Sequence, residues 1–357
     1  MIADLDGKTI HIGGEEVQHA LLSRYLAKIG HEVTSLVGDF GQQPVETVAG
    51  VKVCKTFPLR AGIPGLRFFS PRLSRTWAAL KRADAEVYYI SCAGAMVGVI
   101  AAFCQRYGRR FVFRIASDAD CAPDTLMVTN ARDRMLYHYG LKHADAILAQ
   151  TQKQADLLFQ NYGLRAEVAG MFSDLPDTIK SFDERAIDLL WLANMRHMKR
   201  PEMFLDVVRQ VPELRCEMAG GAHHEEAALY ARVEQGAAGL PNLRFHGQVK
   251  FGTGRTLFSN ARVFVNTSSL EGFPNTYLQA WANGVPVVAT FDPDGIIAAR
   301  GLGVAVTDAA DAASEARALL ADRAAWAACS ARCRAYANER LAPELVSAPY
   351  LAAMAAA

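Results

Sequence analysis

The sequence lacks an excess of charge of either sign. It contains 38 Lys and Arg residues against 37 Asp and Glu, a net charge of +1 over 357 residues. Proteins that bind nucleic acid along its backbone need a clear basic excess, so the balance argues against bulk nucleic-acid binding. Hydrophobic residues make up 51% and charged residues 21% of the chain, as in ordinary globular proteins. The length favours two domains.

The cysteine spacings of metal fingers and disulfide frameworks are also missing. The seven cysteines are odd in number and widely spaced, and no signal peptide is recognisable. These features predict a reducing compartment and therefore a cytoplasmic protein. Cys329 and Cys333 are four residues apart, so they share one helix face, and we interpret them as packing residues. Residues 223–226 (HHEE) lack the H-E-x-x-H spacing and indicate a polar loop or helix start. No metal site is expected.

Two common nucleotide-binding motifs are missing as well. No G-x-G-x-x-G follows an expected strand, which argues against a dehydrogenase. Residues 252–256 (GTGRT) imitate the end of a P-loop, but Arg255 stands where the motif has Lys, and Val249 stands where its first glycine belongs. We therefore expect no ATP hydrolysis through a P-loop.

One charge-free stretch imitates a membrane span. Residues 87–104 contain no charged side chain and reach the length at which a span is worth considering. However, residues 87–90 (VYYI) are a short β-branched and aromatic run, typical of a buried parallel strand. Residues 95–107 form an expected helix of small residues that ends at Gly108. A buried strand and a buried helix account for the apolar character without lipid.

Strand patterns alternate with helical periodicity in two halves of the chain. Strands are expected at residues 33–37, 87–90, 110–115, 144–149, 187–192, 214–219, 243–247, 261–266 and 285–289. Helices are expected at residues 17–29, 95–107, 152–162 and 201–210, the last with Pro201 in its first turn. This alternation predicts an α/β protein whose parallel sheets carry helices on both faces.

The expected organisation is two Rossmann-like, doubly wound domains. Residues 1–172 form the first domain, and residues 173–184, rich in Ser, Asp and Pro, form a linker. Residues 185–335 form the second domain. Residues 336–357 form a C-terminal helix, for which packing back onto the first domain is one expectation. Residues 1–12 make a poor first strand, although a doubly wound domain should begin with one.

Residues 266–290 (NTSSLEGFPNTYLQAWANGVPVVAT) carry the strongest chemical signal. They are typical of a strand, a loop, a helix that ends at Gly284, and a second strand. The loop presents Glu271 and Gly272 directly before the helix. Backbone N–H groups at a helix start are unpaired and carry partial positive charge, so they suit a phosphate. Gly272 permits close approach to the backbone. The segment therefore predicts a diphosphate site with polar side chains beside it.

This segment resembles the donor-binding signature of the large retaining glycosyltransferase family that includes sucrose synthases and many bacterial polysaccharide enzymes (family 4, glycosyl transferases group 1). The family pattern E-G-F-P, then L-E-A-M-A-x-G-x-P-V-V, has two Glu eight positions apart. The resemblance implies that Glu271 holds hydroxyls of the transferred sugar and that position 279 holds the ribose. Gln279 replaces the second Glu, and its amide can still bond ribose hydroxyls, without the charge. The donor loop further contains Gly272, Phe273, Pro274, Asn275 and Thr276.

A second mark of the family is its phosphate-binding loop, which residues 192–201 (LANMRHMKRP) resemble. Lys199 matches the family's Lys. Asn194 stands at the family's Arg position, and Arg196 is expected to supply the guanidinium. A cationic pair suits a departing nucleoside diphosphate because negative charge builds on the leaving oxygen.

Further marks occur in order along the chain. Gly13 and Gly14 resemble the glycine pair before the first helix, which faces the cleft near the donor phosphates. A turn that lies near the base in relatives is matched by Gly247, Gln248 and Val249. Asp118 and Asp120 follow a strand where relatives often carry a His near the acceptor, and that His is absent here.

The resemblance implies the GT-B fold, in which two Rossmann-like domains face a cleft. It further implies transfer of a hexose-type sugar from a nucleoside-diphosphate sugar with retention of configuration and without metal or cofactor. The expected acceptor is a glycan, a lipid-linked molecule or a small molecule, in cell-surface polysaccharide or glycolipid synthesis. The candidate catalytic residues are Glu271, Lys199, Arg196 and Asp118. A non-catalytic sugar-nucleotide-binding subunit and a nucleotide-sugar epimerase of the same fold are the alternatives.

Each assignment also has a structural alternative. Glu271 could accept hydrogen bonds from amides at the helix start, and Lys199 and Arg196 could belong to a solvated turn. The pair at 13–14 could be only a tight turn. Asp118 and Asp120 could be helix caps.

A basic stretch lies between residues 47 and 83, which contain no Asp or Glu. Phe68, Phe69 and Trp77 are interleaved with its cations, which are Lys52, Lys55, Arg60, Arg67, Arg72, Arg75, Lys81 and Arg82. Basic and aromatic residues together suit an anionic bilayer or a phosphate-bearing acceptor. A solvated helix face with core aromatics is the alternative. The hypothesis is that a lipid-linked acceptor docks here and that the protein contacts the inner face of the cell membrane peripherally.

Overall fold

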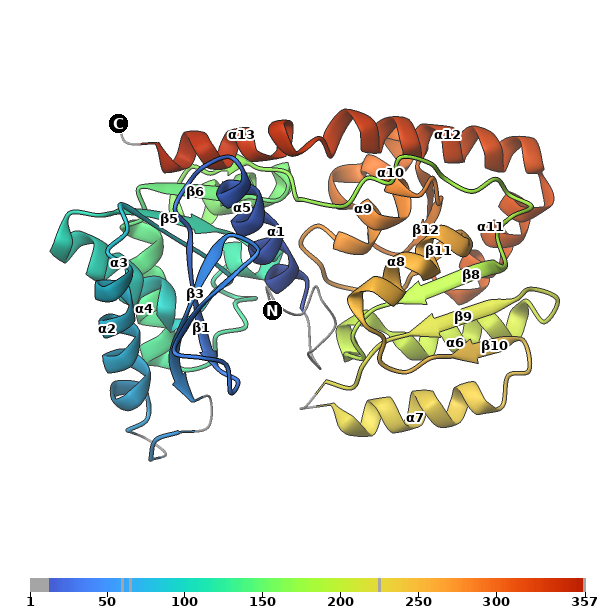
Figure 1. The fold of residues 1–357 in the computed structure, drawn as a ribbon. Coiled ribbons are helices and arrows are strands. Elements are labelled where there is room, and N and C mark those ends of the chain that lie inside the picture. The colour runs from blue at the N-terminus through green and yellow to red at the C-terminus, as the bar shows by residue number, and fades with distance from the viewer. Residues whose placement is uncertain (1–12, 59–60, 64–65, 224–225, 356–357) are drawn as a thin grey trace. The chain divides into compact units, whose positions relative to one another are not determined.

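The computed structural model describes residues 13–58, 61–63, 66–223 and 226–355. They form two compact units, each of the α/β class (Figure 1). The N-terminal unit contains Glu15–Ala169 together with the chain from Ser347 onward, and the C-terminal unit is chiefly Gly170–Val346. The poor first strand expected at residues 1–12 lies outside the described residues.

The N-terminal unit alternates helices with strands, as its periodicity predicts. Its elements are α1 (Gly14–Lys28), β1 (Thr34–Asp39), β2 (Val45–Val48), β3 (Val51–Pro58), η2 (Phe68–Leu73), α2 (Ser74–Ala83), β4 (Val87–Ser91), α3 (Ala95–Tyr107), β5 (Arg110–Arg114), η3 (Asp118–Cys121), α4 (Ala131–Lys142), β6 (Ala146–Ala149), α5 (Gln152–Tyr162) and β7 (Glu167–Val168). Strands β4-β5-β6-β7 form one parallel sheet in that order. Strands β1-β3-β2 form a second sheet.

Strand β2 departs from the expected parallel arrangement. It pairs antiparallel with β3, from Val45↔Cys54 to Val48↔Val51. Ala49 and Gly50 join the two strands with φ values of 51° and 81°. Two consecutive positive φ angles are the backbone of a type I′ hairpin turn. An Asn-Gly pair in the sequence predicts such a turn, whereas an Ala-Gly pair does not.

The charge-free stretch at 87–104 is a strand followed by a buried helix, which confirms the interpretation without lipid. Helix α3 ends at Gly108, whose φ of 60° closes the helix. It packs closely on α4 because Gly98 has no side chain: a Cβ there would lie 2.2 Å from the Leu136 carbonyl oxygen. Among the described residues, no helix is long and apolar enough to cross a membrane.

The C-terminal unit contains one parallel sheet, in the order β10-β9-β8-β11-β12-β13. Its strands are β8 (Ile187–Leu192), β9 (Cys216–Ala219), β10 (Leu243–Phe245), β11 (Ala261–Asn266), β12 (Val287–Ala289) and β13 (Gly303–Ala305). Its helices are η4 (His197–Lys199), α6 (Pro201–Gln210), α7 (Ala227–Ala238), α8 (Phe251–Asn260), α9 (Asn275–Ala282), η5 (Pro293–Gly295), α10 (Ile296–Arg300), α11 (Ala309–Ala321) and α12 (Arg323–Arg340); α13 (Pro343–Met354) follows.

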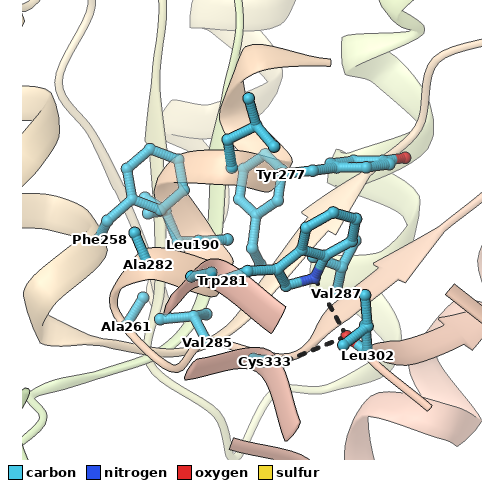
Figure 2. Packing of buried hydrophobic residues seen from close by; sticks show 14 of the residues in the cluster. Leu190, Phe258, Ala261, Tyr277, Trp281, Ala282, Val285, Val287, Leu302 and Cys333 are labelled. Carbon is cyan, nitrogen blue, oxygen red and sulfur yellow. Dashed lines mark hydrogen bonds between the residues drawn. The ribbon is translucent and has the colours of Figure 1, made fainter. Parts of the chain in front are cut away.

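Side chains of this sheet alternate between two buried layers, as the two-residue repeat of a strand requires. Leu190 and Phe264 belong to one layer, whereas their neighbours on each strand belong to the other. Figure 2 shows the first layer, in which Trp281 of α9 donates its indole N–H to the Leu302 carbonyl at 3.3 Å. Cys333 contacts the same carbonyl. Cys329 and Cys333 thus lie in a packed core, as expected.

The structure also bears on three segments: the stretch that imitates a P-loop, the expected linker and the expected end of the second domain. Residues 252–256 lie inside helix α8, so they do not form the phosphate-binding turn of a P-loop. Residues 173–184 contain no helix or strand. The domain limit expected at 335/336 falls within α12, which continues to Arg340.

Candidate active site

Two loops leave the same edge of the C-terminal sheet side by side. Residues 193–200 follow β8 and residues 267–274 follow β11, and these strands are parallel neighbours with Val263↔Leu189 and Phe264↔Leu190 in register. The carboxyl ends of parallel strands meet at one edge, where ligands of doubly wound sheets bind. The fold thus brings together the two segments that the sequence predicts to hold the donor.

Lys199 and Glu271 form an ion pair across these loops. Their side chains are 20% and 12% exposed, so both charges are largely withdrawn from water while remaining accessible at the sheet edge. The Ser269 N–H donates to the Met198 carbonyl at 2.8 Å and fastens one loop to the other. The carboxylate therefore has a strong local partner, and that partner is the ammonium expected to bind phosphate.

The donor loop leads into α9, as expected. Glu271 and Gly272 precede the helix, and Pro274 stands at its N-cap without a side-chain hydrogen bond. No side chain at the N-cap therefore bonds the first turn of α9, whose Tyr277 N–H donates to the Pro274 carbonyl at 3.0 Å. The positive end of the helix faces the side on which the donor loop lies, as an anion requires. Asn275 and Gln279 are four residues apart on α9, so they share one helix face. Thr276 lies three residues before Gln279 on the same side.

Arg196 has a different partner from Lys199. Its Nε lies 3.8 Å from Glu226 Oε1 and, although buried, makes no hydrogen bond. Glu226 also accepts a hydrogen bond from the His197 N–H. The Glu226 carboxylate, which precedes α7, thus binds the backbone of the Arg196 loop at His197. The Nε–H of Arg196 remains able to donate a hydrogen bond.

The turn at 247–249 lies at the same edge of the sheet, after β10. Gly247 adopts a φ of 60°, and its carbonyl accepts the Gly220 N–H at 2.8 Å. The Gln248 side chain packs over Gly221, because a Cβ there would lie 3.2 Å from the Gln248 Cδ atom. Val249 packs against the first core layer. The loops after β10, β9, β8 and β11 therefore form a continuous row.

The remaining predicted residues belong to the first part of the chain. Gly13 precedes α1, and Gly14 is its first residue. Asp118 has partners on both oxygens: Lys153 Nζ at 2.8 Å and Gln154 Nε2 at 3.2 Å. This arrangement suits a structural role better than that of a proton acceptor.

Asp120 is the helix-capping residue that the structural alternative expected. It completes a capping box with Ser117 at the start of η3. Burial raises the pKa of Asp120 to about 6, while hydrogen bonds from the N–H groups of Ala116, Ser117 and Ala93 oppose the shift.

A polar cluster in the N-terminal unit escaped the sequence interpretation. Arg114 ends β5 fully buried and donates to both oxygens of Glu15, at 3.1 and 2.9 Å. Gln150, directly after β6, donates to the same carboxylate at 2.7 Å. A charged residue within a buried strand run is the one signal that could have found this cluster.

His19 of α1 lies beside that cluster. Its Nε2 is 2.7 Å from the Ser91 hydroxyl at the end of β4. Burial lowers the pKa of His19 to about 4; Glu15 opposes this shift and Arg114 adds to it. The ring is therefore neutral at pH 7.

Comparisons with known proteins agree with this geometry. A glycosyl transferase 4-like domain matches residues 13–170, and the family described as glycosyl transferases group 1 matches residues 186–322. Together the two matches span most of the chain. Among curated protein sequences, none matches the chain.

Several solved structures share the fold. Sucrose-phosphate synthase from Thermosynechococcus elongatus aligns with a TM-score of 0.78 and 17% identity over 97% of this chain and 94% of that chain. HepE from Anabaena, in complex with UDP-glucose, aligns with a TM-score of 0.74 and 15% identity over 96% of each chain. TarM from S. aureus, in complex with Fondaparinux, alpha-GlcNAc-glycerol and UDP, aligns with a TM-score of 0.65 and 14% identity over 80% of this chain and 59% of that chain.

At these low identities the structural similarity shows only the fold. Membership of a family rests on the matches to the two family models. A parallel sheet with Lys199 and Glu271 at its carboxyl edge occurs within the region matched by group 1. The chain belongs to the group 1 glycosyltransferases and has the GT-B fold.

Proposed function

We propose that this chain transfers a hexose-type sugar from a nucleoside-diphosphate sugar to an acceptor hydroxyl with retention of configuration. The observation that carries the proposal is the Lys199–Glu271 pair beside the start of α9. The diphosphate binds the Lys199 ammonium and lies at the positive N-terminal end of α9. The released Glu271 carboxylate then accepts hydrogen bonds from the sugar hydroxyls, and Gln279 meets the ribose.

The chemistry asked of these residues is charge stabilisation. The acceptor hydroxyl attacks the anomeric carbon as the bond from that carbon to the phosphate oxygen breaks. The electron pair stays on the departing diphosphate, and the hydroxyl proton passes to the leaving oxygen. Lys199 and Arg196 compensate the growing negative charge, which is the role that a divalent metal plays in other transferases. We therefore propose a reaction that needs no metal.

For the nucleotide, UDP is the first choice to test. HepE was solved with UDP-glucose bound and TarM with UDP bound. The test is a thermal-shift screen with UDP, GDP, ADP and their sugars. We expect the nucleotides of one base to raise the unfolding midpoint more than the others, since a ligand that binds only the folded state stabilises it.

The transfer itself is tested with the selected donor and candidate acceptors. We expect nucleoside diphosphate to be released only when an acceptor is present, in the presence of EDTA, and proton NMR to show that the product keeps the donor's anomeric configuration. Binding without release under any acceptor would favour the non-catalytic subunit. A changed sugar without acceptor would favour the epimerase.

We further propose that the acceptor is lipid-linked and meets the N-terminal unit at the segment around η2. Three large apolar side chains of this segment are exposed: Ile63 (68%), Leu66 (61%) and Phe69 (57%). Arg67, which follows Leu66 in the sequence, and Arg75, in the first turn of α2, are exposed as well. Exposed apolar side chains in a segment that also carries cations suit an anionic bilayer, because the apolar groups enter the interface and the cations contact the headgroups.

Vesicle sedimentation tests this surface. We expect binding to vesicles of phosphatidylglycerol and phosphatidylcholine, weaker binding at high salt, and loss of binding when Ile63, Leu66 and Phe69 are replaced by Ser. Phe159→Ser, an equally exposed change on α5, serves as the control that keeps binding. Equal affinity for anionic and purely neutral vesicles at low salt would reject the proposal.

A further inference from the structure

The loops that carry Lys199 and Glu271 meet at one buried side chain, Thr267, which is 1% exposed. The Trp191 indole N–H donates to the Thr267 hydroxyl oxygen at 3.0 Å. The hydroxyl hydrogen faces two carbonyl oxygens, that of Lys199 at 2.6 Å and that of Arg200 at 2.9 Å. A single hydroxyl thus joins the end of β8, the loop that follows it, and the loop after β11.

The backbone of Arg200, at the end of this loop, has an unfavourable conformation. It adopts φ 44° and ψ 56°, the left-handed region that side-chain-bearing residues seldom occupy. Such a conformation persists only where the surroundings determine it. Its Nε donates to the backbone carbonyl of Thr267 at 2.6 Å. Thr267 therefore bonds the strained turn through both its side chain and its backbone.

Packing alone does not account for a hydroxyl at this position. Valine has nearly the same shape as threonine and would fill the same space. It would leave the buried indole N–H of Trp191 without its acceptor and the Lys199 carbonyl without the hydroxyl donor, and such losses carry a penalty. The Arg200 carbonyl would keep the Met203 N–H, which donates to it at 3.1 Å. The loop would then relax at Lys199, the residue whose carbonyl bonds Thr267 and whose ammonium meets Glu271.

We propose that Thr267 is a positioning residue that fixes the backbone at Lys199 and so holds its ammonium where the donor diphosphate binds. The inference rests on the proposed function, in which Lys199 binds that diphosphate. Thr267 contacts no substrate, and its whole effect passes through Lys199. Nucleoside binding, which does not use Lys199, is independent of it.

The test compares Thr267→Val and Thr267→Ser with the native chain by calorimetric titration. The probes are the diphosphate selected in the thermal-shift screen (UDP, GDP or ADP) and its matching nucleoside. Thr267→Val should weaken diphosphate binding about tenfold, the effect of losing two hydrogen bonds, and leave nucleoside binding within about twofold. Thr267→Ser keeps the hydroxyl and should restore diphosphate binding.

Thr151→Val is the matched control. Thr151 is 2% exposed, and its hydroxyl caps α5 by accepting the Gln154 N–H. The same chemical change there should lower stability and leave both affinities unchanged. If Thr267→Val does not fold, Thr267→Ala, which leaves room for water at the carbonyl groups, takes its place with the same expectation.

A double-mutant cycle with Lys199→Ala decides the mechanism. In that background Thr267→Val should weaken diphosphate binding no further. The proposal is overturned if Thr267→Val only lowers stability, as Thr151→Val does, or if its effect persists fully without Lys199. If Lys199→Ala itself leaves diphosphate binding unchanged, the proposed function of Lys199 fails first, a result that the single variant reveals.

Discussion

Replacing Glu271 by Gln should separate donor binding from turnover. In the ligand-free protein Glu271 holds the Lys199 ammonium, and both side chains are mostly buried. A nucleoside diphosphate without a sugar must compete with that carboxylate for Lys199. Glu271→Gln removes the competing charge and keeps the size. We therefore expect tighter binding of the free nucleoside diphosphate and slower sugar transfer.

The magnitude follows from the burial of the pair. Unit charges about 4 Å apart interact by roughly 4 kcal/mol at an effective dielectric constant near 20. The remaining exposure of both groups and the desolvation of each reduce the net coupling to about 1–2 kcal/mol. This corresponds to roughly 5- to 30-fold tighter diphosphate binding. Loss of a charged group that stabilises the transition state should lower kcat by about 100-fold or more.

The assay is titration of nucleoside diphosphate into the native chain, Glu271→Gln and Lys199→Ala, with transfer followed by diphosphate release. Lys199→Ala should weaken diphosphate binding and lower kcat/KM by about 100-fold. Glu213→Gln, which removes an exposed carboxylate paired with Arg317, should change neither quantity. The reasoning is refuted if Glu271→Gln weakens diphosphate binding as Lys199→Ala does, or if it transfers sugar at the native rate.

Gln279→Ala should mainly raise the donor KM, because a ribose contact is the same in ground and transition states, while Gln279→Glu should keep activity or tighten donor binding; an abolished kcat in Gln279→Ala would contradict the ribose assignment. Gly98→Ala should destabilise the protein by about 1–3 kcal/mol in urea unfolding, because its Cβ would lie 2.2 Å from the Leu136 carbonyl oxygen; Gly252→Ala, which meets open space on α8, is the control that keeps full stability. The pKa of His19 falls from 6.5 to about 4 on folding, so the stability it contributes is present above pH 6.5 and lost as pH falls towards 4. His19→Gln should therefore lose less stability than the native chain between pH 7 and pH 4.5, and equal losses in the two proteins would show that His19 does not titrate in this way.

Much of the fold could be predicted because short-range rules determine it. Helices α3, α5 and α6 run over the ranges that periodicity predicts, Ala95–Tyr107, Gln152–Tyr162 and Pro201–Gln210. Strands β8 and β11 likewise cover Ile187–Leu192 and Ala261–Asn266. Each boundary depends on neighbours in the chain, such as Gly108 after α3 and Pro201 at the start of α6. The hairpin of β2 and β3 was missed because its Ala-Gly turn lacks the usual signal.

The candidate site was predictable only as separate motifs. Lys199 and Glu271 each stood in a recognisable pattern, but they are 72 positions apart. Their pairing required β8 and β11 to be neighbours in the sheet, which neither motif specifies. The partner of Arg196 was hidden for the same reason: Glu226 belongs to a polar stretch whose place beside the loop depends on the order of the strands.

The sequence by itself therefore determined which segments are strands and helices and which loops carry chemistry, because periodicity, glycine and proline act over a few residues. The tertiary structure decided which loops lie next to each other and which charged side chains form ion pairs. The Thr267 hydroxyl between two loops has no local signature, and nothing near Arg114 in the sequence identifies Glu15 as its partner. Their roles depend on contacts between distant segments, which form only when the sheet orders its strands and excludes water from between them.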